Sequence, residues 1–174
     1  MIGRVLGLGA AMGLMAALVV TSEARAEDED ELYYEKESSV YAELSAGASY
    51  FLLKNTEENN RFSGGVGLTI GGHLSPHFAM EVQYGYQGYS NTQLVSYNLK
   101  YVFLTDSVQP WISGGIGMMG GSPGGPPFLF MGRINAGSNF FLTEQWAVAP
   151  SVSYAGAKDK DVFLANLGVV YYFE

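Results

Sequence analysis

The chain has 174 residues, of which 48% are hydrophobic, 14% are aromatic and only 15% are charged, whereas a disordered chain would be richer in charge and poorer in aromatic residues. Its formal net charge of −8 excludes the basic surface that is typical of nucleic-acid binding. Because there is no cysteine, the sequence excludes disulfides, thiolate metal sites, cysteine nucleophiles and a lipid anchor on cysteine.

The first 26 residues have the three parts of a secretory signal peptide. A basic start at Arg4 is followed by an apolar run over 5–20 and by a small-x-small cleavage site formed by Ala24 and Ala26. The apolar run is shorter than the roughly 20 residues that a membrane-spanning helix needs, which favours cleavage over an uncleaved anchor. The acidic segment that follows, 27–38, is interpreted as a flexible tether that its own charges keep extended.

From Ser39 onward, apolar and small or polar residues alternate with a period of two, which is typical of β-strands. Turn-forming clusters divide this region into eight predicted strands: 40–53, 61–74, 78–87, 92–103, 111–119, 128–142, 146–155 and 162–173. The sequence therefore predicts an all-β domain over 39–174.

A soluble barrel and a membrane barrel both produce this alternation, with the apolar face turned inward in the first and toward lipid in the second. Here the polar face is rich in glycine, serine and alanine, which suit a narrow eight-stranded lumen. Aromatic residues lie near the segment ends, as an interfacial girdle requires. These features favour an eight-stranded antiparallel up-and-down transmembrane β-barrel over a soluble periplasmic protein.

Two kinds of connection alternate along the domain. A leucine and a hydroxyl residue begin the connections at 74–77, 104–106 and 142–144, which we expect to be periplasmic turns. The polar or glycine-rich connections between them are expected to face outward from the cell. Both ends of the barrel domain then lie on the periplasmic side.

Four stretches carry a resemblance to a known family: LSPHFAMEVQYGY, VQPWISGGIGM, LTEQWAVAPSVSY and NLGVVYYF. Through them, the region 39–174 resembles the small outer-membrane β-barrels of Gram-negative bacteria, the group of the OmpA transmembrane domain and OmpX. The resemblance implies a monomeric barrel in the outer membrane, in contact with its lipids, including lipopolysaccharide. It also implies delivery by periplasmic chaperones and insertion by the barrel assembly machinery.

The C-terminal segment fits the assembly signal of that family. The residues that carry this match are Asn166, Gly168, Tyr171 and Phe173. The chain departs from the family pattern in ending on Glu174 instead of an aromatic residue.

The alternation assigns five charged residues to the lumen: Glu43, Arg61, Glu81, Lys100 and Arg133. Because isolated charges in a narrow lumen are unfavourable, we expect these residues to pair. Folding the hairpin of the third and fourth segments brings Glu81 close to Lys100, and Glu43 and Arg133 are expected to extend this pair into a network. The network is interpreted as a polar plug, with a gate or a cation-selective path as the alternative.

One cluster resembles a catalytic site. His73 and Ser75 have the spacing found in outer-membrane lipid A deacylases, where histidine activates a serine nucleophile. The cluster falls in a predicted periplasmic turn, however, whereas lipid A lies in the outer leaflet. His73 and His77 lack a third metal ligand beside them. The sequence therefore predicts no catalytic residue, metal or cofactor.

The leading functional hypothesis is a non-enzymatic outer-membrane barrel with a structural or surface-interaction role in the cell envelope. The first alternative is a narrow channel for ions or small molecules. A lipid A-modifying enzyme built on His73 and Ser75 is the remote alternative.

Overall fold

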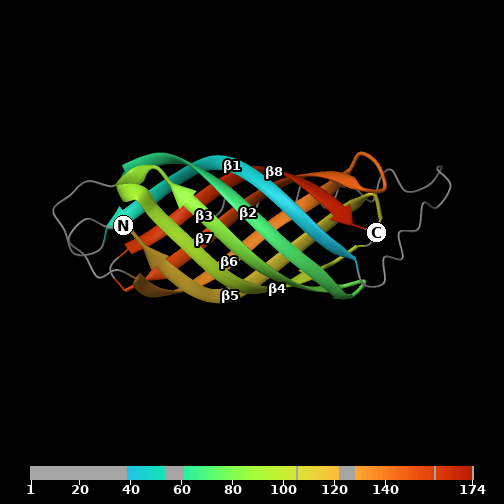
Figure 1. The fold of residues 1–174 in the computed structure, drawn as a ribbon, viewed down its shortest axis with the longest axis horizontal. Helices are drawn as coiled ribbons and strands as arrows, with labels where there is room; N and C mark the ends of the chain where they lie inside the picture. Colours follow the sequence, from blue (N-terminus) through green and yellow to red (C-terminus); the bar gives the residue numbers. More distant parts are fainter. Residues whose placement is uncertain (1–38, 54–60, 105, 122–127, 159, 174) are drawn as a thin grey trace, which may run out of the picture. The chain divides into compact units, whose positions relative to one another are not determined.

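The computed structural model describes residues 39–53, 61–104, 106–121, 128–158 and 160–173. They form eight strands and one short 3-10 helix: β1 (Val40–Leu53), β2 (Arg61–Ser75), β3 (Phe78–Gln87), η1 (Tyr89–Asn91), β4 (Thr92–Val102), β5 (Val108–Gly120), β6 (Phe128–Phe141), β7 (Trp146–Ala157) and β8 (Lys160–Phe173). Each strand pairs antiparallel with the next, and β8 pairs back with β1, which closes the barrel (Figure 1). No helix among the described residues is long and apolar enough to cross a membrane.

The predicted segments correspond to the strands one for one, and the predicted bounds of β1 and β3 are those observed. The largest difference is at β5, which begins at Val108 instead of Trp111. Pro110 has no N–H, but its carbonyl oxygen accepts a hydrogen bond of 2.9 Å from the amide of Phe103. The proline therefore extends the strand at a place where the sequence pattern suggested a turn.

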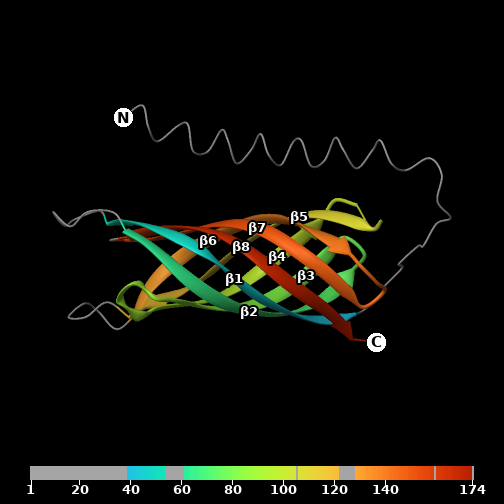
Figure 2. The same ribbon diagram turned by 90° about the horizontal axis from the view of Figure 1, so that it is seen from above.

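The predicted signal peptide (1–26), the acidic segment (27–38), Thr105 and Glu174 lie outside the described residues, so these predictions stay predictions. The barrel wall itself begins and ends at one edge, because Val40 pairs with Phe173 (Figure 2). We call this edge the turn end, since the β2–β3, β4–β5 and β6–β7 connections also lie there, and we call the opposite edge the loop end.

Hydroxyl groups stabilise two of the connections at the turn end. The hydroxyl of Ser75 accepts a hydrogen bond of 3.1 Å from the amide of Phe78, which closes the β2–β3 turn. In the β6–β7 turn, the hydroxyl of Thr143 accepts hydrogen bonds from the amides of Gln145 and Trp146. The recurring hydroxyl residue after leucine therefore acts by holding the chain reversal.

The outer face of the wall is apolar along the length of the strands. Large side chains there are exposed, among them Leu44, Val66, Ile70, Tyr97, Leu99, Ile116, Ile134 and Leu167. An exposed apolar surface that surrounds a closed barrel is unfavourable in water and suits a hydrocarbon environment. Closure also suits that environment, because no strand edge is left with unpaired backbone groups.

The lumen is filled by three layers of side chains. A polar layer lies in the middle, an apolar layer closes the loop end, and an aromatic and alanine layer closes the turn end. The loop-end layer consists of Phe51, Leu94, Met119, Met131, Ala155, Ala157, Val162 and Leu164. The turn-end layer consists of Tyr41, Ala79, Ala147, Ala149, Val170 and Tyr172.

Candidate functional site in the barrel lumen

An ion pair between Glu81 and Lys100 lies at the centre of the polar layer. The ammonium of Lys100 is 3.0 Å from Oε1 of Glu81, and both side chains are almost completely buried. The register of the β3–β4 hairpin pairs Glu81 with Asn98, so Lys100 is two residues along the partner strand and faces the same side. The predicted contact is confirmed.

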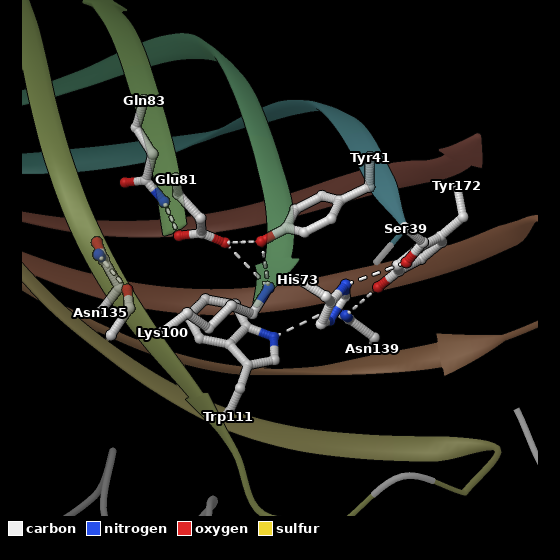
Figure 3. A network of polar contacts seen from close by, with 11 residues as sticks. Ser39, Tyr41, His73, Glu81, Gln83, Lys100, Trp111, Asn135, Asn139 and Tyr172 are labelled. Atoms are coloured by element: carbon white, nitrogen blue, oxygen red, sulfur yellow. Dashed lines mark hydrogen bonds and ion pairs between the residues drawn. The ribbon is translucent and has the colours of Figure 1, made fainter. Parts of the chain in front are cut away.

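Two neutral side chains complete the surroundings of the Glu81 carboxylate (Figure 3). Tyr41 of β1 donates its hydroxyl to Oε1 at 2.5 Å, and Gln83 donates its side-chain amide to Oε2 at 3.0 Å. The same tyrosine hydroxyl accepts a hydrogen bond of 3.4 Å from Lys100. Both carboxylate oxygens are therefore partnered, which a charge buried this deeply requires.

Aromatic rings enclose the Lys100 ammonium. Its nitrogen is 4.4 Å from the ring centroid of Trp111 and 4.9 Å from that of Tyr41, within the range of cation–π attraction. Trp111 is oriented by a hydrogen bond of 3.0 Å from its indole N–H to Asn139, whose amide in turn donates to the hydroxyl of Tyr172 at 2.8 Å. This chain of contacts reaches from the ion pair to the turn-end layer (Figure 3).

Sequence reasoning did not assign these aromatic residues to the site. Trp111 is two residues from Ser113 on β5, and Tyr172 is four residues from Gly168 on β8. Because side chains along a strand alternate between its two faces, both belong to the inward face. Strand parity was the signal that could have found them, but only the charged residues of the inward face were assigned to the site.

Arg133 faces the lumen as predicted, but its hydrogen-bond partners are neutral. Its Nε donates to Asn135 at 2.7 Å, and one terminal nitrogen is 3.5 Å from the hydroxyl of Ser153. Asn135 is itself fixed by donating to the hydroxyl of Ser113 at 2.8 Å. The guanidinium therefore belongs to a second polar cluster on β5, β6 and β7.

Glu43 also faces the lumen and is buried. Its carboxylate packs against Gly168 of β8, where a Cβ atom would collide with Oε1. Within the part of the chain that the structure describes, Glu43 forms no direct hydrogen bond or ion pair. Glu43 and Arg133 line the same small cavity and lie close enough to interact electrostatically with each other and with the ion pair, but no direct ion pair joins them among the described residues. Their predicted role as an extension of the network stays a prediction.

A cavity of about 30 Å³ lies beside these residues, with Glu43, Gln83, Arg133 and Asn166 among its lining. That volume is enough for about one water molecule. Gln83 and Gln87 are both lining residues, and among the described residues their side-chain amide oxygens have no hydrogen-bond partner. The arrangement can bind a hydrogen-bond donor, and water is the simplest group that fits.

Arg61 does not belong to the buried cluster, which corrects the sequence prediction. Its side chain is exposed at the loop end, at the first position of β2, and its guanidinium carbon lies 5.3 Å from the ring centroid of Tyr89. The alternation gave the correct face of the strand, but the position is at the mouth of the barrel, where the charge remains in contact with solvent.

The His73 and Ser75 side chains have different local partners. His73 Nδ1 is 3.2 Å from the hydroxyl of Ser39, and its ring packs against Tyr41 and Tyr172. Ser75 accepts the turn hydrogen bond described above. Among the residues that the structure describes, no group of three or more His, Cys, Asp or Glu side chains is arranged to hold a metal ion.

The residues of the predicted assembly signal all lie in β8. Asn166 and Gly168 are on its inward face, whereas Tyr171 and Phe173 are on its outward face near the turn end. Tyr171 contacts Trp146 at a ring-centroid distance of 4.8 Å, as part of an aromatic group at that edge. Their role in assembly stays a prediction.

Neither a protein-family model nor a curated protein sequence matches the chain. The structure is similar to the N-terminal β-barrel domain of Pseudomonas aeruginosa OprF, with a TM-score of 0.61 and 20% identity, over 79% of this chain and 100% of that one. It is also similar to Neisserial surface protein A, with a TM-score of 0.63 and 13% identity, over 79% and 100% of the two chains. For the attachment invasion locus protein Ail of Yersinia pestis, the TM-score is 0.54 and the identity 14%, over 79% and 99%. At these identities the likeness shows the fold, which is that of the small eight-stranded outer-membrane barrels.

Proposed function

We propose that this chain is an integral outer-membrane protein of a Gram-negative bacterium, of the OmpA and OmpX type, with a structural role in the cell envelope and no enzymatic activity. Its closed barrel carries an apolar outer face, which supports residence in a bilayer. The lumen is occupied by packed side chains, which supports a structural role over transport.

The observation that carries this proposal is the layered filling of the lumen. A permeating ion would have to cross the loop-end layer, where the side chains of Phe51, Leu94 and Met119 are fully buried. An apolar constriction of this kind expels water and opposes ion passage. The ion pair lies in the polar layer below it, where the rings of Trp111 and Tyr41 flank the ammonium.

The test is single-channel recording in planar bilayers with the barrel extracted from membranes. We expect no reproducible conductance steps from the wild-type protein. The double variant Leu94→Ser/Met119→Ser should introduce steps by making the loop-end layer polar, whereas the matched outward-facing variant Met118→Ser should remain silent. Reproducible wild-type steps would contradict a plugged lumen.

A narrow channel is the second candidate, and the cavity beside Glu43 is the observation that favours it. In that case, wild-type barrels conduct, and Glu81→Gln or Lys100→Met changes the size of the steps. The two candidates thus differ in the behaviour of the unmodified protein, not only in that of its variants.

The envelope role has a separate test in cells. Deletion of the gene should increase sensitivity to detergents and to large antibiotics, and expression of the intact chain should restore resistance. Mass spectra of lipid A should be the same with and without the gene, because the Ser75 hydroxyl accepts a backbone hydrogen bond in a turn. A lipid A change that is lost in Ser75→Ala would instead support the enzyme alternative.

Assembly by the barrel machinery and escort by periplasmic chaperones are part of the same proposal. Pairing of β8 with β1 along the whole strand supports a role for the last strand in closing the barrel. Depletion of the assembly machinery should leave the chain in its unfolded, heat-unmodifiable form on gels.

A further inference from the structure

A histidine packs against the turn-end layer, and the proposed function does not use it. The ring of His73 on β2 has its centroid 5.4 Å from that of Tyr41 and 6.1 Å from that of Tyr172. The two tyrosine rings are 5.3 Å apart, so the three rings contact one another. The imidazole therefore forms part of the aromatic packing that closes the lumen at the turn end.

The position of His73 is fixed by the residue that precedes β1. Its Nδ1 lies 3.2 Å from the hydroxyl oxygen of Ser39, and its backbone amide donates a hydrogen bond of 3.0 Å to the carbonyl oxygen of the same serine (Figure 3). His73 is only partly buried, and β2 ends two residues later at Ser75. The ring therefore lies at the border between the packed layer and the solvent at the turn end.

Both tyrosines connect this ring to the polar layer. The hydroxyl of Tyr41 is shared between Glu81 and Lys100, as described above. The hydroxyl of Tyr172 accepts a hydrogen bond from Asn139, which orients Trp111 against the Lys100 ammonium. A displacement of the histidine ring would therefore act on two side chains that hold the surroundings of the ion pair.

The imidazole is the side chain whose ordinary pKa, about 6.5, lies closest to neutral pH. Its neighbour across the β2–β3 pair is Ala79, which carries no charge. The titratable or charged groups of the elements packed around it are Tyr41 and Glu43 of β1, Glu81 of β3, Lys100 of β4 and Tyr172 of β8. The acidic segment 27–38 directly precedes Ser39 in the sequence and lies outside the described residues.

These surroundings favour a neutral ring inside the layer. The Glu81 carboxylate is already engaged by Lys100, and the Lys100 ammonium lies against the same Tyr41 ring that His73 contacts. A protonated ring in this place would add a second cation beside the first, and removal from water would disfavour it further. At the turn end, water is available to solvate that charge.

We infer that His73 is a pH switch of the turn-end layer. The neutral ring stays packed against Tyr41 and Tyr172, whereas the protonated ring leaves the layer for solvent and lets water reach the surroundings of Lys100. The loop-end layer stays packed in both states, so the switch hydrates the polar layer from one end without opening a path through the barrel. The inference goes beyond the proposed function and requires only the folded barrel.

Trp111 is a native probe of this switch. The chain has two tryptophans, and the other one, Trp146, is exposed on the outer face, so Trp146→Phe leaves a single reporter. In that background, the emission of Trp111 and its quenching by acrylamide are followed from about pH 8 to about pH 5, on either side of the ordinary imidazole pKa, with the full chain extracted in mild detergent. Heat-modifiable migration at each pH reports that the barrel remains folded.

Three variants separate His73 from other titrating groups. His73→Gln keeps a hydrogen-bonding side chain without the charge, and His73→Phe keeps a ring without a titratable nitrogen. His77→Gln is the matched control, because His77 is the other histidine of the chain and stacks on Tyr101 at a ring-centroid distance of 6.0 Å, away from the lumen. In His77→Gln, NMR of the ¹⁵N-labelled imidazole also reports the titration of His73 directly.

We expect acrylamide quenching of Trp111 to rise at least about two-fold, and its emission to shift to longer wavelength, as the pH falls through the range of imidazole titration. The same transition should occur in His77→Gln and coincide with the NMR titration of His73. It should be absent from His73→Gln and His73→Phe.

A transition that persists in a folded His73→Gln or His73→Phe barrel would overturn the inference, by assigning the titration to another group. It would also be overturned if the wild-type probe gave no transition, or if the NMR and fluorescence midpoints differed by more than about one pH unit, a tenfold difference in proton affinity. Absence of the chain from the outer-membrane fraction would instead contradict the proposed function and leave the switch intact.

Discussion

The polar layer around Glu81 and the apolar layer around Phe51 occupy the same lumen, but different interactions hold them. The apolar layer is a set of side chains in van der Waals contact, each contributing through the area it removes from water. The polar layer depends on partnered atoms, and the loss of one partner exposes another buried group to the full penalty of desolvation. We therefore expect the two layers to respond differently to mutation.

The sharpest way to test this difference is to remove one charge of the ion pair. Glu81→Leu leaves the Lys100 ammonium buried without its carboxylate, which should lower the free energy of unfolding by about 3–5 kcal/mol. The measurement is urea unfolding of the barrel in phospholipid vesicles. A loss below about 1 kcal/mol would mean that water reaches Lys100 in the folded barrel.

A cavity in the apolar layer should have a smaller effect. Leu94 is fully buried, so Leu94→Ala should lower the free energy of unfolding by about 3 kcal/mol, within the range for buried leucines. The outward-facing variant Leu99→Ala on the same strand is the control, since its side chain is half exposed to the surroundings of the barrel. Equal effects of the two substitutions in detergent would contradict a packed loop-end layer.

Replacement of both charges should be milder than removal of one. Glu81→Met combined with Lys100→Met keeps side-chain volume and leaves no unpaired charge, so we expect a change within about 1.5 kcal/mol of wild type. Together with Glu81→Met alone and Lys100→Met alone, this double variant completes a double-mutant cycle in the same unfolding assay. Additive losses in that cycle would show that the two side chains do not interact.

Glu43 should give the smallest effect among the buried charges. It forms no direct ion pair among the described residues, so Glu43→Gln keeps its shape against Gly168 and should change the free energy of unfolding by less than about 1 kcal/mol. A loss as large as that of Glu81→Leu would show that Glu43 is coupled to Arg133 through water in the cavity.

The same comparison shows how far the sequence could predict the molecule. A period of two identifies strands and their outer face directly, and hairpin register is enough to bring Glu81 to Lys100. The loop-end layer was missed because an apolar residue alone does not show which face of the strand it lies on. Phe51 and Leu164 are identified as inward-facing only because each is two residues from a small or polar inward-facing residue, Ser49 and Asn166 respectively.

The distant contacts of the site could not be predicted for a different reason. Tyr41 reaches Glu81 across β2, and Asn139 reaches Tyr172 across β7, so these contacts depend on the curvature of the closed wall. Register along neighbouring strands does not specify which side chains meet across a lumen. That geometry depends on strand tilt and stagger, which are properties of the whole barrel.

The pairing of β1 with β8 also has a kinetic consequence. Val40 and Phe173 come from opposite ends of the barrel sequence, yet they lie side by side in the wall. The wall has no complete form until its last strand is in place, because a sheet of β1 to β7 would leave two unpaired edges. Contacts between such distant residues slow folding, so closure is expected to be a late event that begins only after synthesis of the C-terminal strand.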